Sequence, residues 1–292
     1  MLLKVALIQQ KSYDTKDETI QKSISLIKEA KEKGAKLVVL QELHQDRYFC
    51  INEDTKNFKK AEGFKEDIKF WSNIAKKFEI LLVTSLFEQR ASGIYHNTAV
   101  VFESNGEVAG KYRKMHIPDD PGFYEKFYFT PGDIGFEPID TSIGRLGVLI
   151  CWDQWFPEAA RIMALKGAQI LIYPTAIGWF DEDSKEQKDK QLDSWVTIQR
   201  SHAVANGLPL ISVNRVGFEK DHTNCLKGIR FWGNSFVCGA QGEIIKKADE
   251  KSETVIIAEI DLDKTKEARD IWPFFRDRRI ESYSPILKRY DD

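Results

Sequence analysis

Cysteine is scarce in this sequence. Only Cys50, Cys151, Cys225 and Cys238 occur among 292 residues, and none of them belongs to a Cys-x-x-Cys pair or a His-spaced zinc pattern. Disulfides and structural zinc are therefore not expected, and we predict that the protein uses no metal and no cofactor. Considered one at a time, each cysteine fits a small buried apolar side chain.

Long apolar runs and an excess of charge are also missing. No uninterrupted apolar stretch reaches the roughly 18 residues that cross a bilayer. The first run, MLLKVALIQQK, has neither a basic lead nor a small-residue cleavage site. Because the formal net charge is only -2, no broad basic surface for nucleic acid is expected. We predict a cytoplasmic protein that binds neither membrane nor nucleic acid.

The remaining composition, 42% hydrophobic and 30% charged, is that of an ordinary globular protein. Apolar runs, several of them typical of strands covered on both faces, predict strands at 3–9, 36–42, 80–88, 97–103, 145–151, 168–176, 209–217, 234–239 and 254–261. Apolar residues spaced by three or four predict helices at 16–33, 64–78, 157–166 and 184–205. This order predicts one α/β domain over residues 1–292, with helices outside and sheets inside.

Cys151 lies where the apolar run RLGVLIC gives way to a predicted helix. A turn between a strand and a helix exposes side chains, and the first N–H groups of the helix favour a thiolate and can bind a developing oxyanion. From the local sequence alone, a nucleophile and a buried core cysteine are both open interpretations.

Two charged residues pose a similar question. Glu42 directly follows an apolar run that should be buried, so its carboxylate is a helix cap, a paired ion or a tuned acid or base. Lys114, in the basic stretch KYRKMHIP, fits an ordinary solvated lysine when taken by itself. His116 follows closely, but the sequence offers no evident Cys-His pair.

Taken together, the segments LVVLQE, YRKMHIP and GVLICWD resemble the nitrilase superfamily, whose members carry a Glu, a Lys and a Cys in this order. The resemblance covers essentially the whole chain. It implies a four-layer α-β-β-α sandwich of the nitrilase type, commonly paired with a second subunit. It also implies an amidohydrolase with a cysteine nucleophile that works without metal or cofactor.

The resemblance implies roles for individual residues. Glu42 is the expected general base for Cys151, and Lys114 is the expected donor to the oxyanion, with help from the backbone N–H of Trp152. Glu125, in GFYEKFYF, is expected to orient Lys114 and the substrate. The predicted substrate-binding or supporting residues are Glu125, Trp152, Asp153 and Tyr48. A thiol with a pKa of about 8.5 is mostly protonated at neutral pH, so it needs such a base or cation.

Longer segments resemble the subfamily of N-carbamoylputrescine amidases, which act in polyamine synthesis. These segments are ICWDQWFPEAARIMALKGAQILIYPTAIG, IQRSHAVANGLPLISVNRVG, FWGNSFVCGAQGEI and WPFFRDRRIESY. The resemblance implies a small ureido substrate with a cationic tail, hydrolysed to putrescine, carbon dioxide and ammonia. Relatives that cleave N-carbamoyl amino acids clamp a carboxylate with arginines soon after the nucleophile, where this chain has Gln154 and Trp155. An aromatic wall there is compatible with an aliphatic cation.

The sequence leaves several alternatives open. The carboxylate that would hold the tail amine is one of Asp119, Asp120, Asp181, Glu182 and Asp183, although each also fits a solvated loop residue. The substrate of a β-ureidopropionase, an N-carbamoyl-D-amino-acid hydrolase, an ω-amidase or a nitrilase is a further alternative. A catalytically silent binding or scaffold subunit is disfavoured, because all three catalytic residue types are present.

The ending from Trp272 through Tyr290 is rich in aromatic and basic residues, as in WPFF and RDRR, and shows no evident element of its own. Exposed aromatic patches often mark subunit contacts. We expect residues 272–292 to form a tail that contacts a neighbouring subunit in a homo-oligomer, either a dimer or a larger assembly.

Overall fold

The computed structural model describes residues 2–292, so residue 1 of the predicted domain lies outside the described residues. Two six-stranded sheets and one three-stranded sheet form its centre. The first sheet has the order β15 (Thr254–Asp261), β1 (Leu2–Gln9), β2 (Leu37–Val39), β3 (Leu81–Ala91), β4 (Ile94–Phe102) and β5 (Val108–Arg113). The second has the order β14 (Ile244–Lys247), β13 (Phe236–Cys238), β10 (Leu210–Asn214), β8 (Ile170–Thr175), β7 (Gly144–Val148) and β6 (Ile139–Thr141). The third has the order β11 (Val216–Lys220), β12 (Gly228–Trp232) and β9 (Gly178–Trp179).

Both large sheets are mixed. In the first, β1, β2 and β3 are parallel and the other pairings are antiparallel. In the second, β7, β8 and β10 are parallel. The helices are α1 (Lys16–Glu32), α2 (Phe64–Phe78), α3 (Glu125–Tyr128), α4 (Pro157–Leu165), α5 (Lys185–Asn206) and α6 (Leu262–Ile271). The 3-10 helices are η1 (Phe49–Ile51), η2 (Thr55–Ala61), η3 (Cys151–Trp155), η4 (Ile280–Ser282) and η5 (Ser284–Leu287).

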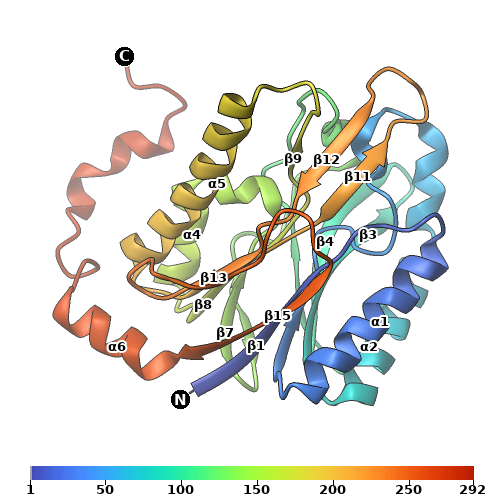
Figure 1. The fold of residues 1–292 in the computed structure, drawn as a ribbon. Coiled ribbons are helices and arrows are strands. Elements are labelled where there is room, and N and C mark those ends of the chain that lie inside the picture. The colour runs from blue at the N-terminus through green and yellow to red at the C-terminus, as the bar shows by residue number, and fades with distance from the viewer. Residues whose placement is uncertain (1) are drawn as a thin grey trace.

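Alternation along the strands of the first sheet separates two hydrophobic cores. Val5 and Leu7 belong to the core shared with the second sheet, whereas Ala6 and Ile8 belong to the core shared with α1 and α2. Trp71 of α2 is fully buried in this outer core. Figure 1 shows α1 and α2 side by side along the first sheet. One face of this sheet is therefore covered by helices and the other by a second sheet.

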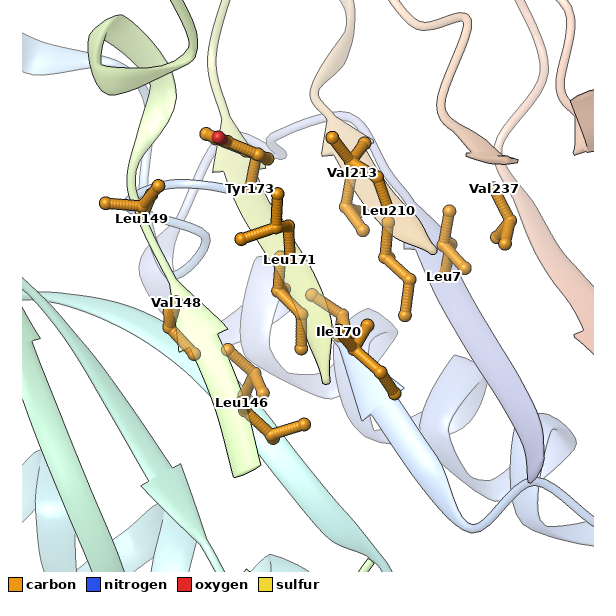
Figure 2. Close-up of a cluster of buried hydrophobic side chains, with 14 of the residues drawn as sticks. Leu7, Leu146, Val148, Leu149, Ile170, Leu171, Tyr173, Leu210, Val213 and Val237 are labelled. Carbon is orange, nitrogen blue, oxygen red and sulfur yellow. The ribbon is translucent and has the colours of Figure 1, made fainter. Parts of the chain in front are cut away.

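The second sheet is covered on both faces as well. Figure 2 shows Leu146, Ile170, Leu210 and the neighbouring strand residues packed into one continuous apolar cluster. Met163 of α4 and Trp195 of α5 complete this core from the outer side. The helix–sheet–sheet–helix order confirms the predicted four-layer α-β-β-α sandwich.

Local capping signals set the ends of the long helices. Thr15 caps α1 in a capping box with Glu18, and Ser184 caps α5 in a second box with Gln187. Gly207, at φ 56°, ends α5 in a left-handed conformation. Because these signals act over a few residues, the predicted helices at 16–33, 64–78, 157–166 and 184–205 are confirmed almost to the residue.

Several predicted strand bounds were wrong: the predicted strand at 209–217 is divided into β10 and β11, which belong to different sheets, and two strand ends near the candidate site differ as well. β2 ends at Val39 and β7 at Val148, three residues before Glu42 and Cys151. Beyond these ends the chain turns out of the sheets, and Leu43 and Cys151 take left-handed φ values of 47° and 43°. Continuous hydrophobicity does not distinguish a paired strand from a buried turn that follows it.

Residues 272–292 lie at the periphery. Figure 1 shows this tail leaving α6 and running along the edge of the molecule, outside the layers. The tail was expected to have no secondary structure of its own, but it contains the two short 3-10 helices η4 and η5. Within the described part of the chain, no helix is long and apolar enough to span a membrane.

Candidate active site

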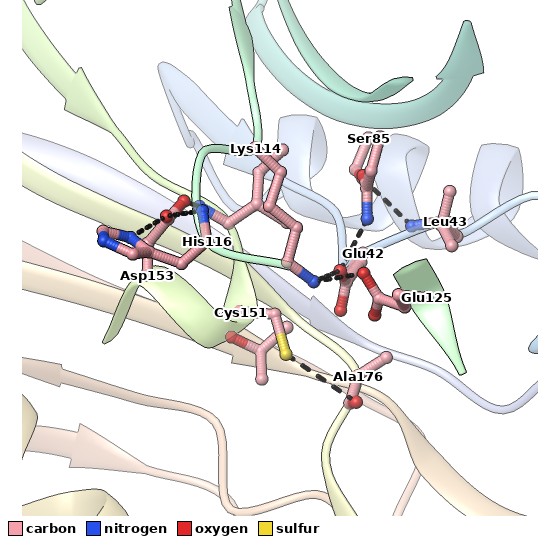
Figure 3. Close-up of polar contacts among 12 residues, drawn as sticks. Glu42, Leu43, Ser85, Lys114, His116, Glu125, Cys151, Asp153 and Ala176 are labelled. Carbon is pink, nitrogen blue, oxygen red and sulfur yellow. Dashed lines mark hydrogen bonds and ion pairs between the residues drawn. The ribbon is translucent and has the colours of Figure 1, made fainter. Parts of the chain in front are cut away.

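Cys151 is the first residue of η3, just beyond the end of the second sheet. Its left-handed φ of 43° costs a non-glycine residue about 1–2 kcal/mol, a strain that is often found at functional sites. The side chain is 4% exposed, and Sγ lies 3.8 Å from the carbonyl oxygen of Ala176 (Figure 3). The turn places the thiol at the edge of the sandwich, where a cavity can reach it.

Lys114 lies between two carboxylates. Its Nζ donates to Oε1 of Glu42 at 2.7 Å and to Oε2 of Glu125 at 2.6 Å (Figure 3). The three side chains are fully buried. They come from the segment after β2, the end of β5 and the start of α3, which the fold brings together. Burial opposes the charge on Lys114, but Glu125 and Glu42 outweigh it, so its pKa lies well above the usual value and the residue stays an ammonium.

Glu125 and Tyr48 form the far side of this cluster. The Tyr48 hydroxyl donates to Oε1 of Glu125 at 2.7 Å. Burial raises the pKa of Glu125 to about 7, against the opposing effect of the Lys114 ammonium. Burial and the nearby Glu125 hold the pKa of Tyr48 well above its usual value, so the phenol keeps its proton. Of the predicted supporting residues, Tyr48 therefore contacts Glu125, which contacts Lys114.

The two carboxylate oxygens of Glu42 differ. Oε1 accepts from Lys114 and from Nδ2 of Asn97, both at 2.7 Å. Among residues 2–292 nothing donates a hydrogen bond to Oε2, although that atom is buried. Asn97 is itself fixed, because its Oδ1 accepts from Ser85 at 3.0 Å, whose Oγ accepts from the Leu43 N–H at 3.1 Å. Oε2 is therefore the oxygen that can take a proton.

Burial, with a smaller effect of Glu42, raises the pKa of the Cys151 thiol well above its usual value, although Lys114 acts in the opposite direction. The resting side chain is therefore a thiol. Because a thiol is a weak nucleophile, attack by this cysteine would require a base that removes its proton.

Asp153 links the Cys151 turn to the segment after Lys114. Its Oδ1 accepts from the His116 N–H at 3.0 Å and lies 2.8 Å from Nδ1 of the same residue (Figure 3). Its Oδ2 accepts from the Ile150 N–H and from Tyr112, both at 2.9 Å. Since Asp153 is fully buried and its oxygens are engaged by these groups, it fits a supporting residue rather than a substrate ligand.

The sequence interpretation missed Asn97 and Arg215. Nη2 of Arg215 donates to the carbonyl oxygens of Glu42 at 3.1 Å and Leu43 at 2.8 Å, and Nη1 donates to Glu219 at 2.7 Å. Through these hydrogen bonds the Arg215 guanidinium stabilises the strained turn that carries Glu42. For Arg215, the one signal in the sequence was the presence of an arginine near the end of the apolar run PLISVNRVG.

A cavity of about 500 Å³ opens beside Cys151. Its walls are largely aromatic and include Phe123, Trp152, Trp155, Trp179, Phe180 and Trp232. Asp120 and Asp183 also line it. Two other predicted amine anchors are engaged elsewhere, because Asp181 pairs with Arg230 and Glu182 with Lys227.

The predicted site residues thus separate into groups. Glu42, Lys114 and Glu125 form one buried cluster, whereas Trp152 contributes to the wall of the cavity together with Cys151. In the described residues, no group of three or more His, Cys, Asp or Glu side chains could hold a metal ion.

A family model described as carbon-nitrogen hydrolase matches residues 4–270, and the chain belongs to this family, within the nitrilase superfamily. The chain is 43% identical to an N-carbamoylputrescine amidase from Oryza sativa subsp. japonica, covering 97% of this chain and 94% of that protein. It is 39% identical to a citrullinase from Francisella tularensis, with 99% of each chain covered. A crystal structure of a carbon-nitrogen hydrolase from Helicobacter pylori matches with a TM-score of 0.98, 56% identity and complete coverage of both chains.

Proposed function

We propose that this protein hydrolyses N-carbamoylputrescine to putrescine, carbon dioxide and ammonia. One observation carries the proposal: a buried Lys114 ammonium held between Glu42 and Glu125, with the thiol of Cys151 at the adjoining aromatic cavity. The similarity to the rice enzyme supports the choice of substrate. The acidic groups of the cavity, Asp120 and Asp183, suit a cationic tail.

In the first step, Sγ of Cys151 attacks the ureido carbonyl carbon while Oε2 of Glu42 takes the thiol proton. The carbonyl oxygen becomes an oxyanion, which Lys114 and the backbone N–H of Trp152 stabilise. The oxyanion then collapses, the bond from carbon to the terminal nitrogen breaks, and the proton held by Glu42 passes to that nitrogen. Ammonia leaves, and a carbamoyl thioester remains on Cys151.

In the second step, water attacks the thioester carbon and gives its proton to Glu42. Collapse of the second oxyanion breaks the carbon–sulfur bond, and the proton returns to Cys151. The released carbamate decomposes to carbon dioxide and putrescine. Glu125 positions Lys114 throughout, because its Oε2 accepts a hydrogen bond from Nζ at 2.6 Å.

The test is a steady-state assay of ammonia release. The wild-type protein should hydrolyse N-carbamoylputrescine faster than its carboxylate analogue N-carbamoyl-β-alanine and faster than citrulline. Cys151→Ala should abolish turnover, whereas Cys225→Ala should not, since Cys225 is exposed and is not among the residues that line the cavity. Near-wild-type turnover by Cys151→Ala would refute the mechanism, and a preference for either carboxylate-bearing substrate would refute the specificity.

We also propose that residues 1–292 form one hydrolase domain whose tail, residues 272–292, contacts a second copy in a homo-oligomer. Large apolar side chains of this tail are exposed, including Ile280 at 68%, Leu287 at 90% and Tyr290 at 82%. Apolar surface of this kind commonly marks a protein interface. The four cysteines are free thiols, which fits the proposed cytoplasmic location.

A further inference from the structure

We infer that Asp120 and Asp183 together bind the terminal ammonium of the substrate's aliphatic tail in the cavity beside Cys151. This inference rests on the proposed function and adds the residues that recognise the tail. Both carboxylates line the cavity that Cys151 lines. The other acidic loop residues near them, Asp119, Asp181 and Glu182, do not line it.

The backbone at Asp120 is rigid. The Phe123 N–H donates to the Asp120 carbonyl oxygen at 2.8 Å, which closes a four-residue turn. Pro121 occupies the second position, and Gly122 the third with a φ of 78°, the geometry of a type II turn. The turn fixes the backbone that carries the Asp120 side chain, and this side chain lines the cavity.

The carboxylate of Asp120 lacks a partner. Among residues 2–292 it makes no hydrogen bond and no ion pair within contact distance. Burial, and then the neighbouring Asp119, raise its pKa, whereas Lys126 acts in the opposite direction, and the residue as a whole remains exposed to solvent. A bound ammonium would supply the missing opposite charge.

Asp183 approaches the cavity from a neighbouring segment. Its Oδ2 accepts from the Phe180 N–H at 3.2 Å, and the rest of the described chain forms no ion pair with it. The two segments touch, because a Cβ built on Gly122 would lie 3.4 Å from Cε1 of Phe180. Asp120 and Asp183 are therefore carried by two turns that pack against each other.

The charge of the cavity wall favours a cation. Lys190 is the one lysine or arginine among its described lining residues, and its Nζ is already paired with Glu186 at 2.6 Å. Aromatic rings of Trp155, Trp179 and Phe180 line the same space and can also attract an alkylammonium ion. The site thus fits an unbranched urea that ends in a primary ammonium. A tail with a carboxylate, such as that of citrulline, would find no unpaired cation in this wall.

The test combines charge-neutral variants with two substrates. The values of kcat/KM are measured for N-carbamoylputrescine and for N-pentylurea, in which a methyl group replaces the ammonium. In Asp120→Asn and Asp183→Asn the ratio of the two values should fall by about ten- to a hundredfold, the scale of one lost charge-assisted hydrogen bond. If N-pentylurea turns over too slowly to measure, its inhibition constant replaces its kcat/KM.

Matched controls are Asp119→Asn and Glu182→Gln, which remove the same charge from adjacent residues outside the cavity wall. The ratios of these controls should stay within about twofold of wild type, since neither residue lines the cavity that would hold the tail. If the kcat/KM ratio fell equally in controls and test variants, the effect would come from the overall charge of the region, and the inference would be overturned. An unchanged ratio in Asp120→Asn and Asp183→Asn would also overturn it. Failure of the wild-type protein to hydrolyse N-carbamoylputrescine would instead refute the proposed function itself.

Discussion

At the candidate active site, side chains of opposite charge lie next to one another and are buried away from solvent. Lys114 balances Glu42 and Glu125, and each of these contacts is between fully buried atoms. In such surroundings the removal of one partner leaves an uncompensated charge. The proposed chemistry of the site therefore depends on all three residues together.

Replacement of Lys114 tests its proposed role at the oxyanion. Lys114→Met should lower kcat by about 100-fold or more, since the transition state loses one preorganised donor. Steady-state assays measure this loss, and circular dichroism checks that the variant is folded. Lys126→Met, a change at an exposed lysine of α3, is the matched control and should retain wild-type kcat. A Lys114→Met variant with wild-type turnover would remove Lys114 from the mechanism.

Glu125 should leave a signature in the pH dependence of stability. Its pKa is about 7 in the folded protein, compared with about 4.3 in an unfolded chain. Between these values the folded state binds more protons, so Glu125 makes the free energy of unfolding fall as pH rises. Glu125→Gln removes this contribution. Its free energy of unfolding, relative to that of wild type, should rise by up to about 3 kcal/mol between pH values of about 4.5 and 7.5.

Urea unfolding of both proteins across this pH range measures the difference. Glu281→Gln, which changes an exposed carboxylate of the tail, provides the control for the loss of one acidic group. A pH-independent difference between Glu125→Gln and wild type would contradict the raised pKa of Glu125.

At the scale of elements, the backbone around Lys114, just after β5, lies very close to the backbone around Gly132. The Gly132 N–H donates to the Lys114 carbonyl oxygen at 2.8 Å. A Cβ on Gly132 would lie 2.1 Å from the carbonyl oxygen of Arg113, far inside van der Waals contact. Only glycine fits here without moving the backbone that carries Lys114.

Gly132→Ala should therefore lower both stability and activity. Displacement of the Arg113 backbone should cost about 1–3 kcal/mol of unfolding free energy and move Nζ of Lys114 away from Glu42. Urea unfolding and kcat measure the two effects. Gly63→Ala is the control for the loss of a glycine, because no atom lies within 4 Å of the Cβ built there and its φ of -83° is open to other residues. Unchanged kcat in Gly132→Ala would show that the approach does not position Lys114.

Long helices were predictable from sequence because their ends are encoded locally, as at Thr15 and Ser184. Short edge strands were not. β6, β9 and β14 span three, two and four residues, and each pairs with one neighbouring strand over only two or three residues. A run of that length carries too little periodicity to separate a strand from a loop.

At the scale of the whole molecule, the tail is the part that the sandwich leaves uncovered. Phe275 still packs within its own chain, because Arg161 and Arg269 lie over its ring at 5.2 and 5.0 Å. Beyond it, Ile280, Leu287 and Tyr290 are mostly exposed. The proposed subunit contact spans residues 272–292, and its most exposed large apolar side chains lie in residues 280–292.

Deletion of residues 280–292 should reduce the assembly to a monomer, since it removes the exposed side chains of Ile280, Leu287 and Tyr290 and keeps Phe275. Light scattering coupled to gel filtration measures the mass before and after deletion. Leu287→Lys should weaken the assembly in the same direction, whereas Ile94→Lys, a change at a half-exposed isoleucine of β4, is the control. A monomeric full-length protein, or an unchanged mass after deletion, would refute the contact.

The sequence by itself determined the layered α/β architecture, the order of the main elements and the identity of the residues proposed for catalysis. Apolar periodicity and caps act over a few residues, and the segments around Glu42, Lys114 and Cys151 are distinctive enough to be recognised. Tertiary structure alone decided that Oε2 of Glu42 accepts no hydrogen bond from residues 2–292, and that Asn97 and Arg215 hold Glu42 in place. It also showed that, of the five candidate carboxylates, Asp120 and Asp183 line the cavity beside Cys151. These features depend on contacts between segments far apart in the chain, whose burial and pairing no local pattern encodes.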